Sequence, residues 1–430
     1  MKVLMFGWEF PPHISGGLGT ACYGLTKALS VFPGMDLTFV VPKIWGDEPA
    51  GGMQLMGASE INLVASKIKA EAFKTPFTYL SVQSGMLPYI DPAAYSEAIR
   101  EAEKKASATG KQDPFESIRF TGAYHSELIT EIHNFSVVGE HIARQHDFDV
   151  IHAHDWLTFP AGIKAKQATG KPLVIHVHAT DFDRSGGNAN PDVYTIEKAG
   201  MDAADRIIAV SNHTKQIIAE KYFIDRSKIT AVHNGVEPFF KSAEKHMKKQ
   251  KNRKTVTFLG RITTQKGPQY FVEVAQKILS RMQNVKFVMA GSGDLLQAMM
   301  KLVNDLNLRE NFSFPGFLKG HAVRNCLKYS DVFIMPSVSE PFGISPLEAM
   351  YCKVPVIISK QSGVSEVIQH AIKVDYWDTD AMADAVYSIL NRPVLHKILK
   401  KKGANEVEEI NWGKSALKVV DVYSSLLARA

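Results

Sequence analysis

Two carboxylates stand in one short stretch, EPFGISPLEAM at residues 340 to 350. Its proline and glycine are typical of a loop, whereas Ser345 is a candidate N-cap and Pro346 suits a first helical turn. The pattern therefore predicts that Glu340 precedes a helix and that Glu348 lies inside it. Because a helix N-terminus attracts anions such as phosphates, Glu340 is left to accept hydrogen bonds from a neutral group.

Two cations share a second stretch, GRITTQKG at 260 to 267, which places Arg261 and Lys266 five positions apart. Cations at this spacing can bracket a diphosphate, and ordinary surface charge is the alternative. The loop follows a strand-like run, and open α/β sheets bind ligands at the carboxyl ends of their strands. The sequence GSGD, which begins at Gly291, follows the next such run and repeats the arrangement.

A glycine-rich loop, SGGLG at 15 to 19, separates the first strand-like run from the first helical pattern. Glycines in this position let the backbone approach a ligand, although a plain tight turn explains them equally well. The loop is not a GxGxxG motif, and no acid stands where it would bind the ribose of NAD. A dinucleotide cofactor is therefore not expected.

Histidines end two predicted strands, in HAHDW (152 to 156) and HVHATDFDR (176 to 184). Alternation along a strand places His152 and His154 on one face. Paired histidines at a strand end can bind a metal, but the second half of the chain lacks further His and Asp residues in matching places. We favour a cleft-lining role for His154 over a metal site or a core histidine.

Three Asp-x-Asp triplets occur, at 147 to 149, 181 to 183 and 378 to 380. Such pairs can hold a divalent cation on a nucleotide diphosphate. The first precedes a predicted strand and the last resembles a helix N-cap, so we interpret both as structural.

The elements that position these residues alternate between strand-like and helix-like stretches, which predicts parallel sheets with helices on both faces. The predicted strands cover 2–6, 37–42, 149–154, 172–178, 206–211, 255–260, 285–291, 312–316, 331–337 and 354–359, and the clearest helices cover 21–32, 267–281 and 294–306. The pattern stops before residue 241 and restarts after 254. We therefore expect an α/β protein of two doubly wound, Rossmann-like domains that face a cleft.

The expected domains are an N-terminal domain at 1–240, with an insertion at about 59–120, and a C-terminal domain at 255–411. The segment 241–254 is a basic linker with seven Lys or Arg residues against one Glu, and 412–430 is a helix expected to return to the first domain. Without this linker the net charge of +6 almost disappears, so a nucleic-acid partner is not expected.

Composition is that of a globular protein, since 45% of the 430 residues are hydrophobic. No apolar run approaches the roughly 18 residues of a membrane span, and the N-terminal run is unlike a signal peptide. We therefore expect a soluble, cytoplasmic protein without stable membrane insertion. The three cysteines, Cys22, Cys326 and Cys352, have neither paired nor metal-type spacing and are expected to be buried thiols.

Taken together, GRITTQKG, EPFGISPLEAM and HAHDW, in this order, resemble the motifs of retaining family 4 glycosyltransferases of the GT-B fold, close to the glycogen and starch synthases. The stretch GWEFPPHISGGLGTA resembles members of the glycogen synthase type most, with a starch-synthase-like N-terminal domain. The resemblance implies transfer of glucose from ADP-glucose or UDP-glucose to the end of an α-1,4-glucan, without a cofactor or metal.

The resemblance also assigns roles to residues. Arg261 and Lys266 would hold the donor diphosphate, Glu340 the sugar hydroxyls and Glu348 the ribose. His154 would contact the reacting sugar. The remaining donor contacts implied by the resemblance are Gly17 and Leu18, which would close over the donor, Gly291, Phe317 at the base, and the backbone of Phe342, Gly343 and Ile344.

Two departures leave the donor open. Bacterial glycogen synthases carry a Lys where this chain has Ile14, and a Tyr where it has Glu348. A family 4 enzyme that acts on a small sugar, lipid or cell-envelope glycan is the alternative enzyme. A sugar-nucleotide or glycan-binding regulator and a metal-dependent hydrolase are alternatives from other classes.

Overall fold

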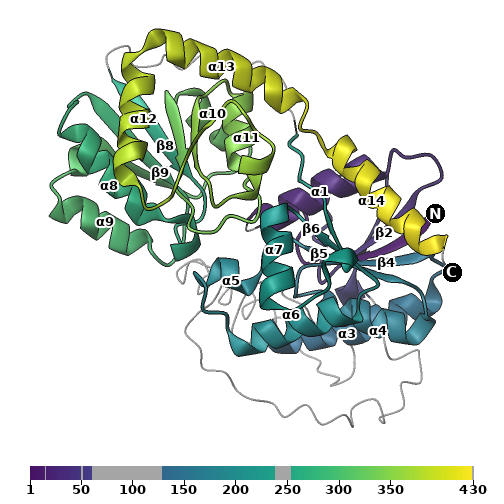
Figure 1. Cartoon of the computed structure of the whole chain (residues 1–430). Helices are drawn as coiled ribbons and strands as arrows, with labels where there is room; N and C mark the ends of the chain where they lie inside the picture. Colours follow the sequence, from purple (N-terminus) through teal and green to yellow (C-terminus); the bar gives the residue numbers. More distant parts are fainter. Residues whose placement is uncertain (15, 50–51, 61–127, 238–252, 429–430) are drawn as a thin grey trace. The chain divides into compact units, whose positions relative to one another are not determined.

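The computed structural model describes residues 1–14, 16–49, 52–60, 128–237 and 253–428, which form two β-sheets and the helices around them (Figure 1). Residues 61–120 of the predicted insertion and 241–252 of the predicted basic linker lie outside the described residues. In the described part of the chain, no helix is both long enough and apolar enough to span a membrane.

The first sheet has seven strands in the order β3-β2-β1-β4-β5-β6-β7, and β1 pairs in parallel with both β2 and β4. The strands are β1 (Lys2–Phe6), β2 (Asp36–Val41), β3 (Gln54–Gly57), β4 (Val150–His154), β5 (Leu173–Val177), β6 (Arg206–Ala209) and β7 (Ile229–Ala231). The helices of this region are α1 (Gly17–Leu29), α3 (Leu128–Gln145), α4 (Phe159–Thr169), α5 (Asp181–Arg184), α6 (Pro191–Ala203) and α7 (Asn212–Lys221).

Burial explains why the strands of the first sheet read as apolar runs. Every residue of β4 and β5 is buried, as expected for a parallel sheet covered on both faces. Helix α3 approaches α4 closely at Gly139, where an added Cβ would lie 3.0 Å from the Cβ of Ala161. The ring of Phe135 on α3 meets that of Phe6 edge to face at 6.0 Å, so the helix is anchored to β1.

The second sheet has six strands in the order β10-β9-β8-β11-β12-β13, with parallel pairs throughout. The strands are β8 (Lys254–Leu259), β9 (Val285–Ala290), β10 (Phe312–Gly316), β11 (Val332–Met335), β12 (Val356–Ser359) and β13 (Ile372–Val374). Its helices are α8 (Pro268–Leu279), α9 (Leu296–Asp305), α10 (His321–Lys328), α11 (Ser345–Tyr351), α12 (Thr379–Asn391) and α13 (Pro393–Glu408), and α14 (Trp412–Leu427) follows them.

Strand β11 shows how the second sheet is covered on both faces. Val332 and Ile334 pack into an apolar cluster with α8, α9 and α12, whereas Phe333 and Met335 pack into another with α10, α11 and α13. This alternation follows from the period of two along a strand. The sheet is therefore packed on both faces, and the loops that follow its strands carry predicted donor residues.

The ten predicted strands and three predicted helices are confirmed within a few residues at each end. The unpredicted strands β3, β7 and β13 have three or four residues each and lie at sheet edges, where a short run gives little periodic signal. The predicted C-terminal helix forms as α14, and Ser415 on it donates to the carbonyl oxygen of His233 at 2.6 Å. The return of residues 412–430 to the first domain stays a prediction.

Candidate active site

Backbone hydrogen bonds join the loops that follow β8, β9 and β11. The N–H of Ile262 donates to the carbonyl of Ser292 at 2.8 Å, and the N–H of Leu295 donates back to Ile262 at 3.0 Å. The N–H of Val338 donates to the carbonyl of Gln265 at 2.9 Å. The loop that carries Arg261 and Lys266 is therefore held between the other two, at the carboxyl end of the sheet.

Two glycines allow this close packing. Gly291 has φ 151°, and a Cβ there would lie 1.8 Å from the carbonyl oxygen of Gly260. Gly267 has φ 60°, and a Cβ there would lie 2.3 Å from the carbonyl oxygen of Pro336. Any side chain at either position would push the loops apart, so the predicted donor residue Gly291 is at least required for the geometry of the site.

Lys266 and Glu340 form an ion pair in which both side chains are largely buried, with 17% and 7% exposure. Lys266 ends a short 3-10 turn, Thr264–Lys266, and Glu340 lies in the loop between β11 and α11. The hydroxyl of Ser337 also donates to Glu340 at 3.1 Å. The structure thus brings together a cation predicted to bind diphosphate and an acid predicted to bind sugar.

Arg261 lies on the same loop as Lys266, and its Nη2 donates to Oε1 of Gln265 at 3.1 Å. This contact keeps the guanidinium beside the short turn that carries Lys266. The two predicted cations therefore share one loop, as their spacing indicated.

The backbone of Glu340 is paired as well as its side chain. Its N–H donates to the carbonyl of Gln361 and its carbonyl accepts from the N–H of Gly363, both at 2.9 Å. After Glu340 the chain turns through Gly343, whose φ is 98°. The prediction that Ser345 is the N-cap of α11 is wrong, because Ile344 already has helical backbone angles and Ser345 is the first helical residue.

The other predicted donor residues of the second sheet lie in the loop before α11, in α11 itself and after β10. Phe342 is 2% exposed and, with the half-buried Ile344, packs into the apolar cluster of α11, so only their backbone groups remain for ligand. Glu348 lies within α11, and burial raises the pKa of its carboxyl to about 7. Phe317 follows β10 and is 48% exposed, with the Lys319 ammonium 5.6 Å from its ring centroid.

His154 ends β4 and its side chain is fully buried. Its ring stacks on His152 at 4.2 Å and lies 5.2 Å from that of His176, which is its partner in the strand register. One nitrogen from each ring lies within 4.8 Å of the others. Nitrogens this close together could hold a metal ion, so the metal alternative is not contradicted. The role of His154 toward sugar stays a prediction.

The glycine-rich loop leads into α1, as predicted. Gly17 is the first residue of α1 and is exposed, and Leu18 beside it is half-buried. An added Cβ at Gly17 would meet nothing within 4 Å, whereas one at Gly19 would lie 2.3 Å from Cγ2 of Ile14. The open space at Gly17 leaves its backbone accessible, while Gly19 is needed for packing.

Two of the Asp-x-Asp triplets, at 147–149 and 378–380, bind backbone N–H groups. Asp378 caps α12 by accepting the N–H of Ala381, and Asp149 accepts the N–H of Lys2, which confirms their structural interpretation. Asp183 takes part in a capping box at the start of α5.

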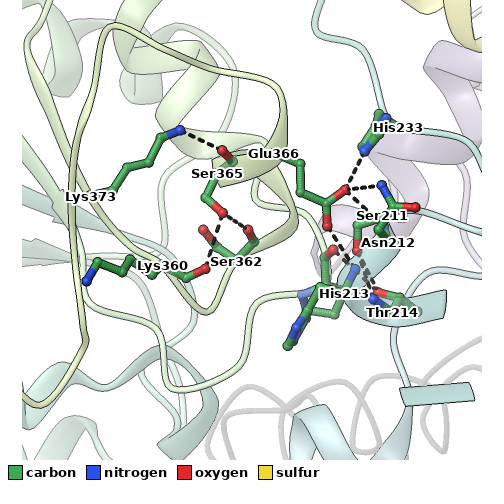
Figure 2. A network of polar contacts seen from close by, with 11 residues as sticks. Ser211, Asn212, His213, Thr214, His233, Lys360, Ser362, Ser365, Glu366 and Lys373 are labelled. Carbon is green, nitrogen blue, oxygen red and sulfur yellow. Dashed lines mark hydrogen bonds and ion pairs between the residues drawn. The ribbon is translucent and has the colours of Figure 1, made fainter. Parts of the chain in front are cut away.

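Sequence reasoning missed Glu366, in the 3-10 turn Gly363–Glu366. Its carboxylate accepts the backbone N–H groups of Asn212 and His213 and binds Nε2 of His233 (Figure 2). The stretch around Glu366 carries no motif of its own. One signal was present elsewhere in the chain: Ser211 is typical of an N-cap and so marks the start of α7, and the free N–H groups of a helix start can also bind a carboxylate.

Two family models match adjacent parts of the chain. The family described as Glycosyltransferase Family 4 matches residues 119–238, and Glycosyl transferases group 1 matches residues 239–406. The second match contains the loops of Arg261, Lys266 and Glu340.

Similar proteins extend over nearly the whole chain. An uncharacterized glycosyltransferase of Methanocaldococcus jannaschii is 27% identical and covers 98% of both chains. A glycogen synthase of Mycobacterium tuberculosis is 23% identical and covers 98% of this chain and 94% of its own. At this identity a close relationship to the glycogen synthases is not confirmed.

Solved structures share the fold. A sucrose-phosphate synthase from Thermosynechococcus elongatus aligns over 100% of both chains with a TM-score of 0.72 and 18% identity. Anabaena HepE, solved in complex with UDP-glucose, aligns over 99% of this chain and 100% of its own with a TM-score of 0.65 and 13% identity. Likeness at this identity establishes the fold, with two Rossmann-like parallel-sheet domains.

Proposed function

We propose that the chain is a retaining glucosyltransferase, on the basis of its GT-B fold and of the matches to Glycosyltransferase Family 4 at residues 119–238 and to Glycosyl transferases group 1 at residues 239–406. In this proposal glucose passes from a nucleotide-sugar donor, ADP-glucose or UDP-glucose, to the non-reducing end of an α-1,4-glucan.

The observation that carries the donor half is the contact between Lys266 and Glu340. A buried ion pair costs desolvation energy and is weak evidence for stability alone. Here it lies beyond the carboxyl ends of the strands, where open α/β sheets bind ligands. A donor supplies a diphosphate for the ammonium and sugar hydroxyls for the carboxylate, so each group gains a new partner when the donor binds.

The chemistry follows from these charges. The bond between sugar C1 and the diphosphate oxygen breaks, and its electron pair leaves with the diphosphate. A new bond forms between C1 and the acceptor oxygen, whose proton passes to an oxygen of the departing diphosphate. Lys266 and Arg261 stabilise the charge that develops on the leaving group, so we propose that no metal is required.

The sugar carries positive charge as its bond to the diphosphate lengthens. We propose that Glu340, which is held by Ser337 and by its backbone pairing, accepts hydrogen bonds from the sugar hydroxyls, and that these bonds strengthen as the ring becomes electron-poor. We propose that Glu348 accepts the ribose hydroxyls and that Phe317 lines the base, where its exposed ring offers a stacking face.

The glucan acceptor rests on different support. The glycogen synthase of Mycobacterium tuberculosis resembles this chain over almost its full length, and GWEFPPHISGGLGTA is the stretch that favours a glycogen-synthase-type enzyme. The acceptor half is therefore independent of the donor half and is tested separately.

The test is a donor panel with glycogen as acceptor. The purified protein is incubated with ADP-glucose, UDP-glucose, UDP-galactose or UDP-N-acetylglucosamine, and release of nucleoside diphosphate is followed with and without glycogen. We expect release that depends on glycogen with one of the glucose donors. Release from a glucose donor that glycogen does not increase would contradict the glucan half and leave the donor half standing.

A further inference from the structure

Four hydrogen-bond donors converge on the carboxylate of Glu366 (Figure 2). The backbone N–H and the side-chain amide of Asn212 both lie 2.9 Å from Oε2, and the N–H of His213 lies 2.8 Å from Oε1. Nε2 of His233 lies 2.7 Å from Oε2. These donors come from the start of α7 and from the segment after β7, so one carboxylate fastens two elements.

The position of Glu366 suits a negative charge. Asn212 and His213 are the first residues of α7, where backbone N–H groups have no partner within the helix and the helix dipole is positive. Burial alone would raise the pKa of Glu366, but the bonds from His233, Asn212 and His213 outweigh it and hold the pKa at about 2. The carboxylate of Glu366 is therefore ionised at neutral pH.

The segment that carries Glu366 is also bonded to the Glu340 loop. Gln361 and Gly363 bracket the backbone of Glu340, and the N–H of Val364 donates to the carbonyl of Phe342 at 2.7 Å. Ser362 and Ser365 fold this segment on itself, because Ser365 Oγ donates to the carbonyl of Ser362 at 2.6 Å. A shift of Glu366 would therefore be transmitted to Glu340 and Phe342 through backbone bonds.

Helix α7 touches the same loop directly. Nε2 of His213 lies 3.3 Å from Oγ of Ser339, and the hydroxyl of Thr214 donates to the carbonyl of Pro341 at 3.4 Å. At Gly363 an added Cβ would lie 2.1 Å from the carbonyl oxygen of Pro341, so the two backbone segments pack closely here. All of these residues belong to one compact unit, formed by Val177–Thr195 and Ile207–Ser424.

From these contacts we infer that Glu366 is a positioning residue for the reaction. It fixes the start of α7 against the segment 361–364, and this segment holds the Glu340 loop in register for the donor sugar. The inference rests on the proposed function, since Glu340 is the sugar-binding acid only in that proposal.

The chain offers a matched control in Glu406. Its carboxylate also accepts two backbone N–H groups, those of Gln369 and His370, and also binds Nδ1 of His370 at 2.9 Å. Its side chain is 15% exposed, against 21% for Glu366. Among the described residues, the hydrogen bonds of Glu406 go to Gln369 and His370 and not to the Glu340 loop. Glu406→Gln therefore weakens a similar set of bonds at a place that is not joined to Glu340.

The first readout needs no ligand. Hydrogen–deuterium exchange is measured on Glu366→Gln, Glu406→Gln and the wild type, for the peptides that cover 337–344 and 361–366. We expect exchange in both peptides to accelerate roughly tenfold in Glu366→Gln and to stay at the wild-type rate in Glu406→Gln. Unchanged exchange at 337–344 in Glu366→Gln would overturn the inference. If that variant does not fold, His233→Ala removes one donor and is used in its place.

The second readout isolates the donor sugar. Calorimetry gives the ratio of Kd values for UDP and UDP-glucose, or for ADP and ADP-glucose, whichever pair the wild type binds. We expect Glu366→Gln to weaken binding of the nucleotide sugar and to leave the Kd of the bare diphosphate nearly unchanged, so that the ratio falls severalfold. In a Glu340→Gln background, Glu366→Gln should have no further effect. Additive effects of the two changes would overturn the inference. A wild type that binds neither nucleotide sugar would instead sink the proposed function, and the exchange comparison would still decide whether Glu366 positions the loop.

Discussion

Lys266 and Glu340 are 74 positions apart in the chain, yet their side chains meet as an ion pair. In the proposed function the two side chains separate when the donor binds, so their contact is not purely structural. In the proposed reaction, two side chains that are already largely buried and held by each other lower the reorganisation needed when the donor binds.

Replacing Lys266 by Ala should lower turnover by roughly 10² or more, because the leaving diphosphate loses a positive charge in a partly dry site. The variant also leaves Glu340 without its cation, so the melting temperature is measured alongside the steady-state rate. Lys301→Ala is the control, since Lys301 pairs with Asp305 on the surface of α9. Near-normal turnover in a folded Lys266→Ala protein would refute the diphosphate assignment.

The sequence predicted the elements of this site but not the contacts between them. Apolar runs and glycine-rich loops are local signals, so β8, β9 and the loop of Arg261 and Lys266 could be placed from residue order alone. The pairing of Lys266 with Glu340 depends on how β8 and β11 lie side by side, which no local pattern reports.

Glu366 shows most clearly what local sequence patterns cannot predict. It lies 153 positions from His213, in a stretch without a motif, and its role arises only where the start of α7 meets the turn after β12. Ser345 is a smaller example, because the chain turns through Gly343 at φ 98° and the N-cap of α11 is Ile344, one residue earlier than the capping pattern suggests.

The two acids of EPFGISPLEAM should separate in their effects. Glu340→Gln keeps the size of the side chain but removes its charge, so turnover should fall roughly 10²-fold while the Kd for the bare nucleoside diphosphate changes only a fewfold. Glu348→Gln should weaken the nucleoside diphosphate through its ribose and affect turnover less. Steady-state kinetics and calorimetric titration on both variants check this, and the reverse pattern would mean that the two assignments must be exchanged.

Metal removal should leave the activity intact. The proposed field on the diphosphate comes from Arg261 and Lys266, so exhaustive EDTA treatment followed by assay in metal-free buffer should retain most of the wild-type rate. Mock-treated enzyme is the control for losses on handling. Inactivation that Mg²⁺ or Mn²⁺ restores would contradict this prediction and would direct attention to the Asp181 and Asp183 pair.

Glu348 should make the stability of the folded protein depend on pH. Burial raises the pKa of its carboxyl from 4.5 to about 7, so the folded protein holds this proton between these two values while the unfolded chain has released it. The favourable contribution of the protonated group to folding is therefore complete below about pH 4.5 and is lost as pH rises through about 7, by at most about 3 kcal/mol. Chemical unfolding of wild type and Glu348→Gln at pH 5 and pH 8 measures this change.

Donor binding should run in the opposite direction. The ionised carboxylate is the better acceptor for ribose hydroxyls, so the Kd for the nucleoside diphosphate should rise several-fold as pH falls from 8 to 6. The phosphate groups titrate in the same range, and for that reason Glu348→Gln and the ribose-free ligand pyrophosphate are titrated over the same pH values. The change of Kd with pH that is due to Glu348 is the change that occurs when the wild type binds the nucleoside diphosphate and that is missing in both controls. Identical pH profiles for wild type and Glu348→Gln would show that Glu348 does not bind the ribose.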